Sequence, residues 1–100
     1  MSAYFILMHT VTDQQQYFER YVTHVLPLLS KHKAEVVVGD LAAKALEGKP
    51  PDGVVVIRFP SEQAIREFLD DPVYQPFKQV RFDLTTNRHA VMAPEFRMPA

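Results

Sequence analysis

Two short apolar runs restrict the possible folds of this chain more than any other feature of its sequence. Residues 4–8 and 54–57 are apolar throughout, are rich in aromatic or β-branched side chains, and are too short to be helices of ordinary length. A strand in a sheet that is covered on one face only alternates apolar and polar side chains. Neither run alternates, so both faces of the strands that they form require burial.

The first predicted helix follows the first strand, which is expected over residues 4–11. Thr12 is the expected cap, and Gln15 lies three residues further on, as in a capping box. Apolar residues then recur at helical spacing. Pro27 lacks an N–H group and is expected to kink or restart this helix, which should end within residues 31–33.

A second helix is predicted between two strands in the second half of the chain. Ser61 is its expected cap, Pro72 should end it, and Pro76 should open a short further helix. The remaining segments are predicted as a strand over 36–38 that stops at 39–40, a short extended segment over 41–46, a loop over 48–53, a strand over 54–59, a turn at 86–87 and a final strand over 88–93.

The resulting order is strand, helix, strand, strand, helix, strand. A sheet with both helices on one face is the compact solution for this order. We therefore predict an α+β, ferredoxin-like β-α-β-β-α-β fold with an antiparallel sheet whose first and third strands are central. A length of 100 residues corresponds to one domain, expected over residues 1–100 with a C-terminal tail over 94–100.

The helices of such a fold leave one face of the sheet uncovered. At about 25 cal/mol per Å², a few hundred Å² of exposed valine and isoleucine would cost several kcal/mol. A second copy of the same sheet is the simplest cover. The unalternating strands therefore predict a sheet-to-sheet homodimer.

Composition excludes several classes of partner and site. The net charge is −1, and the basic residues form no patch or stripe, so no nucleic-acid partner is predicted. The chain has no cysteine, which removes disulfides and thiolate sites and fits a cytoplasmic protein. The N-terminal apolar run lacks the features of a signal peptide and is far shorter than the roughly 20 residues of a membrane span. No membrane association is predicted.

The chain resembles a known family, called domain of unknown function 1330, most specifically in its second half. The resemblance is carried by residues 71–78, by 59–61 before them and by Arg81 after them, and 47–48 also fit. It covers nearly the whole chain and implies the dimeric α/β-barrel fold. The chain departs from the family at 33–34, where members often carry glycines, and at Arg58, where they often have a carboxylate. The wider superfamily includes cofactor-free monooxygenases, lactone isomerases and haem-handling enzymes that use the cavity between sheet and helices.

The candidate catalytic residues are His9, Tyr74 and Arg81. His9 ends the first strand, and histidine titrates near neutrality, so it can move a proton. Arg81 could hold a carboxylate or enolate, and the Tyr74 hydroxyl could orient it. The structural alternative is that Tyr74 packs under a loop while Arg81 pairs with an aspartate, the candidates being Asp70, Asp71 and Asp83.

The candidate substrate-binding residues are Tyr21, Glu47, Arg58 and His89. His89 begins the last strand, the expected antiparallel neighbour of the first, so it could lie near His9 and form a proton-transfer or metal-binding pair. Both histidines could equally be solvent-facing strand ends. Tyr21 and Tyr17 lie one helical turn apart and could be core aromatics, and Glu47 with Arg58 could form a structural ion pair.

Two functions of different classes follow. No spacing of metal ligands and no phosphate-binding or nucleophile motif is present, so neither metal nor cofactor is predicted. The first hypothesis is a cofactor-free enzyme, monooxygenase- or isomerase-like, that acts on a small organic substrate between sheet and helices. The alternative is a non-catalytic dimeric module that binds a small apolar ligand or a protein partner. Polar groups that converge in one cavity favour the enzyme, and an all-apolar cavity favours the module.

Overall fold

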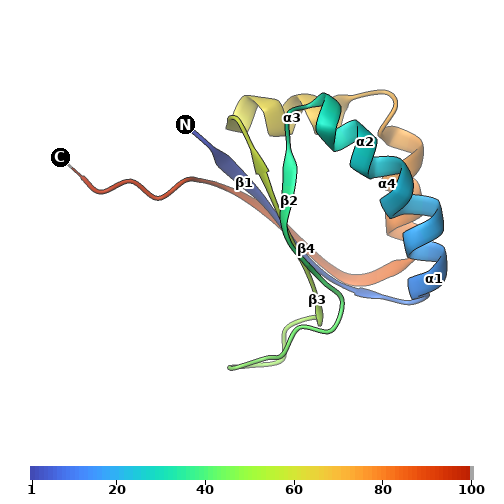
Figure 1. Cartoon of the computed structure of the whole chain (residues 1–100). Helices are drawn as coiled ribbons and strands as arrows, with labels where there is room; N and C mark the ends of the chain where they lie inside the picture. Colours follow the sequence, from blue (N-terminus) through green and yellow to red (C-terminus); the bar gives the residue numbers. More distant parts are fainter. Residues whose placement is uncertain (100) are drawn as a thin grey trace.

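Four strands form one antiparallel sheet in the order β2-β3-β1-β4 (Figure 1). The structure is a computed structural model that describes residues 1–99. Its strands are β1 (Ala3–Val11), β2 (Glu35–Asp40), β3 (Gly53–Phe59) and β4 (Thr85–Pro94). β1 and β3 are central, as predicted. The predicted tail continues β4 without further helix or strand up to residue 99, and residue 100 lies outside the described residues.

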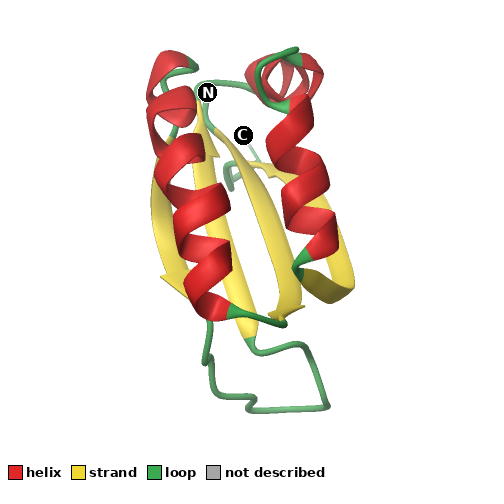
Figure 2. Ribbon diagram, turned by 90° about the vertical axis from the view of Figure 1, so that its right-hand side faces the viewer, coloured by secondary structure: helices red, strands yellow, loops and turns green. Residues whose placement is uncertain are grey.

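The helices all cover one face of this sheet, in two columns that lie side by side (Figures 1 and 2). The first column is one continuous helix made of α1 (Gln14–Tyr17), a π-helical segment η1 (Phe18–Val22) and α2 (Thr23–Lys31). The second contains α3 (Glu62–Asp70) and α4 (Gln75–Asp83). The predicted ferredoxin-like fold is therefore confirmed. No helix within residues 1–99 combines the length and apolarity needed to cross a membrane.

The first helix begins one residue later than predicted. Asp13, rather than Thr12, is the cap, and its carboxylate accepts a hydrogen bond from the backbone N–H of Gln16 at 3.0 Å. The Thr12 hydroxyl instead donates to the carbonyl of Leu84 at 3.1 Å and ties the start of this helix to the end of α4. Pro27 lies within α2, and the irregular part of the helix is η1, on its N-terminal side.

The core lies between the sheet and the helices because alternate strand residues face that way. In β1 the odd-numbered residues from Ala3 to His9 are buried, and in β3 Ile57 and Phe59 are buried beside them. Ile65 and Phe68 of α3 pack over this face, and Ser61 caps α3 as predicted, accepting from the N–H of Ala64 at 3.1 Å. The helix side chains of the first column complete the core with Tyr17, Tyr21, Val25, Leu28 and Leu29.

The opposite face of the sheet carries an unbroken apolar row. The strand registers place Val56 and Val91 opposite Ile6, and Val38 opposite Val56. Val38 and Val91 are exposed, and the two central members are half-buried. The row crosses all four strands. All of the helices lie on the other face of the sheet (Figure 1).

Three segments differ from the sequence-based expectation. Residues 41–46 belong to an irregular loop without helix or strand, in which the Ala43 N–H donates to the Asp52 carbonyl at 2.8 Å. β2 continues through Gly39 and Asp40, where a stop was predicted. β4 already begins at Thr85, so the predicted turn lies inside a strand, where Asn87 and Arg88 form a bulge.

Candidate functional site

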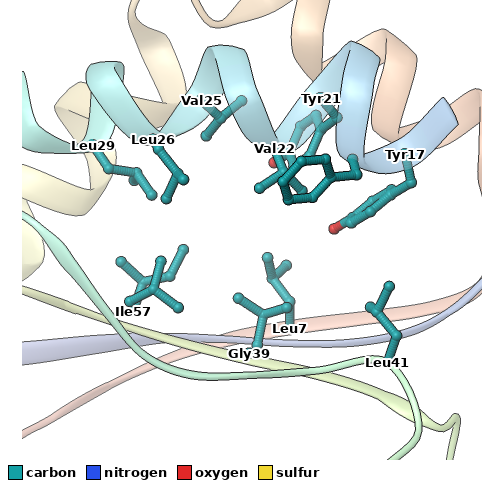
Figure 3. A pocket seen from close by; sticks show the side chains of 13 residues that line it. Leu7, Tyr17, Tyr21, Val22, Val25, Leu26, Leu29, Gly39, Leu41 and Ile57 are labelled. Atoms are coloured by element: carbon teal, nitrogen blue, oxygen red, sulfur yellow. The ribbon is translucent and has the colours of Figure 1, made fainter. Parts of the chain in front are cut away.

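A cavity of about 330 Å³ lies between the first helix column and the sheet (Figure 3). Its upper wall comes from α1, η1 and α2, and its lower wall from β1, β2, β3 and Leu41 of the loop after β2. The volume is at the small end of the range typical of ligand sites, about 300–1,000 Å³. The residues that line it are Leu7, Tyr17, Phe18, Tyr21, Val22, Val25, Leu26, Leu29, Val36, Gly39, Leu41, Val55 and Ile57.

The chemistry of this wall is apolar with two phenolic groups. None of the described lining residues carries a charge, and Tyr17 and Tyr21 supply its polar side chains. Both tyrosines come from the helix where it changes into and out of the π-helical segment. Figure 3 shows the ring of Tyr17 descending from the helix, with its hydroxyl oxygen between the helix and the strands. The cavity therefore suits an uncharged, largely apolar molecule that carries an oxygen atom.

Tyr17 connects the cavity wall to a fully buried histidine. The Tyr17 hydroxyl lies 3.2 Å from Nε2 of His9, and the two rings meet edge to face with centroids 5.6 Å apart. His9 is 0% exposed, because it faces the helices from β1. The predicted catalytic histidine is thus not in the cavity wall, but it contacts Tyr17 of that wall.

Both neighbouring strands shape the space around His9. Gly53 of β3 is its register partner, and a Cβ atom at Gly53 would lie 2.4 Å from the His9 carbonyl oxygen. On the other side, β4 places two residues, Asn87 and Arg88, opposite His9 alone, which is a β-bulge. Asn87 adopts φ +49°, a left-handed conformation that asparagine tolerates better than most residues. The histidine is therefore held by a glycine on one side and a bulge on the other.

His9 is neutral at neutral pH in this environment. Burial, together with the positive charges of Arg81 and Arg88, lowers its pKa from 6.5 to about 4. Arg88 reaches this region because of the bulge, and its Nη1 donates to the carbonyls of Phe82 and Thr85. In this neutral form, one ring nitrogen of His9 donates a hydrogen bond and the other accepts one.

The two cavity tyrosines also remain protonated. Burial raises the pKa of Tyr17 to about 12, although Arg81 opposes the shift. Burial, together with Tyr74, raises the pKa of Tyr21 well above its usual value. The Tyr21 and Tyr74 hydroxyls lie 2.9 Å apart, and Tyr74 is 0% exposed. Tyr74 thus supports Tyr21 from behind the cavity wall and does not line the cavity.

Arg81 of α4 is buried without a carboxylate partner. It is 5% exposed, and its guanidinium carbon lies 4.9 Å from the centre of the Phe82 ring. No ion pair within residues 1–99 includes Arg81, and its Nε has no hydrogen-bond partner there. The alternative that Arg81 pairs with an aspartate is therefore wrong for these residues. Asp71 instead binds Lys31 at 3.1 Å and His32 at 2.8 Å.

The other sequence-predicted site residues are not brought to the cavity. His89 pairs in register with Met8, so it lies on the opposite face of the sheet from His9, and the expected histidine pair does not form. Glu47 is exposed in the loop between β2 and β3. Arg58 forms its ion pair with Glu35 of the neighbouring strand, not with Glu47. Within residues 1–99 no three potential metal ligands of the His, Cys, Asp or Glu type lie together.

Sequence reasoning missed three residues of this site. Tyr17 is predicted as a core aromatic, although its spacing of four from Tyr21 places both on one side of the helix. Gly53 falls in a predicted loop, and Arg88 at the start of a predicted strand. Their roles depend on the registers of β3 and β4 against β1, and no local sequence signal encodes those registers.

Comparison with protein families gives one match. The model of the family described as Domain of unknown function (DUF1330) matches residues 2–94. No curated protein matches the sequence.

Several solved structures share the fold at low sequence identity. A protein of unknown function from Rhodopseudomonas palustris aligns with a TM-score of 0.79 and 16% identity, over 97% of this chain and 84% of that chain. SnoaB from Streptomyces nogalater, a cofactor-independent oxygenase, aligns with a TM-score of 0.63 and 16% identity, over 97% and 95%. A dimeric protein of unknown function and ferredoxin-like fold from Bacteroides fragilis aligns with a TM-score of 0.64 and 9% identity, over 94% of this chain and 96% of that chain.

Proposed function

The chain belongs to the DUF1330 family, whose name states no activity, and we propose its function from the site itself. The protein is a cofactor-free enzyme that binds a small, largely apolar organic molecule in the cavity and stabilises negative charge on one oxygen of that molecule. The observation that carries this proposal is the Tyr17 hydroxyl in the cavity wall, with His9 bonded behind it. The charge of Arg81 acts on both residues from α4.

The proposed chemistry is the formation of an enolate or phenolate. A substrate with an acidic C–H beside a carbonyl group, or with a phenolic O–H, loses that proton to solvent water, and the electron pair remains on the substrate. Tyr17 stays protonated, so its O–H can bond to the oxygen on which the charge develops. Arg81 adds a fixed positive charge in a region of low dielectric constant, where its effect is larger than in water.

The anion has two possible fates, and they correspond to the two reaction types expected from the family resemblance. Return of a proton to a different atom gives an isomerisation. Transfer of electrons from the anion to O₂ gives an oxygenation in which the substrate itself is the reductant. SnoaB, which shares the fold, is a cofactor-independent oxygenase. The proposal concerns the anion that both routes require.

The proposed active form is a homodimer. The uncovered sheet face carries the row Val38, Val56, Ile6 and Val91, and Val91 is 57% exposed. A second copy of the same sheet would bury this row, as the unalternating strands require. The similar protein from Bacteroides fragilis is dimeric.

One observation favours the alternative of a non-catalytic binding module. Apart from the two tyrosines, the lining residues are aliphatic, aromatic or glycine. A carrier of apolar molecules needs no more than this. The two functions differ in what they require of Tyr17, because a carrier loses little affinity for an apolar ligand without the hydroxyl, whereas the enzyme loses its turnover.

The test begins with native mass spectrometry of the protein purified without refolding. We expect a dimer, with an additional mass where a ligand is retained, and the retained molecule defines the compounds to assay. Tyr17→Phe should then reduce turnover about 10²-fold or more, as for the loss of one oxyanion donor, and should weaken binding by no more than about tenfold, as for one neutral hydrogen bond. Full activity of Tyr17→Phe would contradict the proposed role of the hydroxyl. Retained ligand with no turnover in either protein would favour the binding module.

A further inference from the structure

Within residues 1–99, two buried side-chain nitrogens have no hydrogen-bond partner, and both belong to candidate catalytic residues. They are Nδ1 of His9 and Nε of Arg81. We propose that Arg81 is a positioning residue that holds His9 in the tautomer protonated at Nε2, so that the Tyr17 hydroxyl donates its hydrogen bond into the cavity and selects ligands with an acceptor oxygen. This inference rests on the proposed function, because it takes the cavity as the ligand site.

The contact between His9 and Tyr17 can be made in two directions. If Nε2 of His9 carries the proton, it donates to the Tyr17 oxygen, and the tyrosine O–H is free to donate to a ligand. If Nδ1 carries the proton, the bare Nε2 accepts from Tyr17, and the tyrosine offers only lone pairs to the cavity. The tautomer of one buried histidine therefore decides whether the cavity wall presents a donor or an acceptor.

The surroundings of Nδ1 favour the first arrangement. A proton on Nδ1 would be a buried N–H without an acceptor within the described residues, which is rarer and more costly than an unused lone pair. The positive charges that act on His9 come from Arg81 on α4 and Arg88 on β4. Their positive potential disfavours a second proton on the ring, so one of its nitrogens keeps a lone pair.

Arg81 is the stronger of these two influences. Its charge lowers the pKa of His9 more than that of Arg88 does, and it also lowers the pKa of Tyr17. Arg81 is buried, so water screens its charge little, whereas Arg88 is exposed and donates to two backbone carbonyls. Arg81 acts through His9 and lines no part of the cavity.

Of the two tyrosines in the cavity wall, Tyr17 is the one whose hydroxyl can select ligands with an acceptor oxygen. The Tyr21 hydroxyl is already bonded to the Tyr74 hydroxyl, whereas Tyr17 has one partner, His9. Because no lining residue is charged, burying an ionised ligand would be costly. The ligand class that fits is a neutral, flat ketone or related carbonyl compound of about a dozen non-hydrogen atoms, since sites of this kind enclose most of their ligand.

The first experiment reads the tautomer directly. In ¹⁵N-labelled protein at neutral pH, the two ring nitrogens of His9 have distinct shifts for N–H and bare nitrogen. We expect protonated Nε2 and bare Nδ1 in the natural protein. Arg81→Met should move the equilibrium toward Nδ1–H, whereas Arg81→Lys, which keeps a positive charge, should preserve the natural tautomer. Arg20→Met, a matched change on the exposed helix surface, should have no effect.

A Nδ1–H tautomer in the natural protein would overturn the proposal. It would also be overturned by a tautomer that is the same in Arg81→Met and in the natural protein, provided that the amide spectrum shows both to be folded. Should Arg81→Met not fold, the natural protein and Arg81→Lys still decide, because the proposal requires the same Nε2–H tautomer in both.

The second experiment reads the selectivity of the cavity. The probes are 2-acetylnaphthalene and 2-isopropenylnaphthalene, which differ by a carbonyl oxygen in place of a CH₂ group. We expect the ketone to bind about threefold to tenfold more tightly, the value of one neutral hydrogen bond. Tyr17→Phe should remove this preference, and Arg81→Met should reduce it.

The outcomes separate the two proposals. Equal binding of both probes would overturn the donor orientation of Tyr17 and leave the cavity as a ligand site. Binding of neither probe would contradict the cavity as the site for such molecules, and the tautomer measurement would then decide the role of Arg81 by itself.

Discussion

The hydroxyl groups of Tyr21 and Tyr74 lie 2.9 Å apart, although the two residues are 53 positions apart in the chain. Tyr21 belongs to η1, and Tyr74 directly precedes α4. The bond therefore joins the two helix columns behind the wall of the cavity. Both side chains are buried, so each hydroxyl depends on the other for its hydrogen bond.

This mutual dependence predicts non-additive mutations. Tyr74→Phe should lower the free energy of unfolding by about 1–3 kcal/mol, because it leaves the Tyr21 hydroxyl buried without its partner. The double variant Tyr21→Phe, Tyr74→Phe should be destabilised by less than the sum of the single changes. Urea unfolding of the four proteins measures the coupling. Strict additivity would show that the bond contributes nothing to stability.

The close contact at Gly53 predicts a large effect of a small side chain. Gly53→Ala would place its Cβ 2.4 Å from the backbone oxygen of His9, so the β1–β3 pairing has to shift. We expect a loss of about 1–3 kcal/mol, as for other overpacked positions. Gly39→Ala is the matched control, because the nearest atom to its Cβ, on Val36, lies at an ordinary 3.4 Å. Equal effects of the two changes in urea unfolding would contradict this account.

Burial of neutral His9 predicts a specific pH dependence of stability. Its pKa is about 4 in the folded protein and 6.5 as a free side chain, so between these values the unfolded chain binds more protons. Stability should therefore fall as the pH is lowered from 6.5 to 4, by up to the order of 3 kcal/mol from this group. His9→Gln should be less stable at neutral pH but should lose much of this slope. An unchanged slope in His9→Gln, measured by urea unfolding at several pH values, would assign the dependence to other groups.

The apolar row on the uncovered face predicts where the dimer can be broken. Val56→Asp would place a carboxylate in the centre of that row. We expect a monomer or aggregated protein in analytical ultracentrifugation, because a buried, unpaired charge costs several kcal/mol. Gln63→Asp, which adds the same group on an exposed position of α3, should remain dimeric. A folded Val56→Asp dimer would exclude this face as the interface.

Much of the scaffold could be predicted because its signals are local. The strand runs, the cap at Ser61 and the order of elements depend on residues within a few positions of one another. Local signals also explain the errors. Thr12 and Asp13 are both good caps, and the choice between them depends on the bond of Thr12 to Leu84, 72 positions away.

The candidate site likewise depends partly on local sequence signals and partly on contacts between distant residues. The sequence by itself determined the ferredoxin-like order of elements and the surplus of apolar strand surface, because short-range periodicity encodes both. It also provided three candidate catalytic residues, His9, Tyr74 and Arg81. Only the tertiary structure decided that His9 meets Tyr17, while His89 lies on the other side of the sheet. The physical reason is register: successive side chains of a strand point to opposite faces, so a shift of one residue decides which partners a group meets.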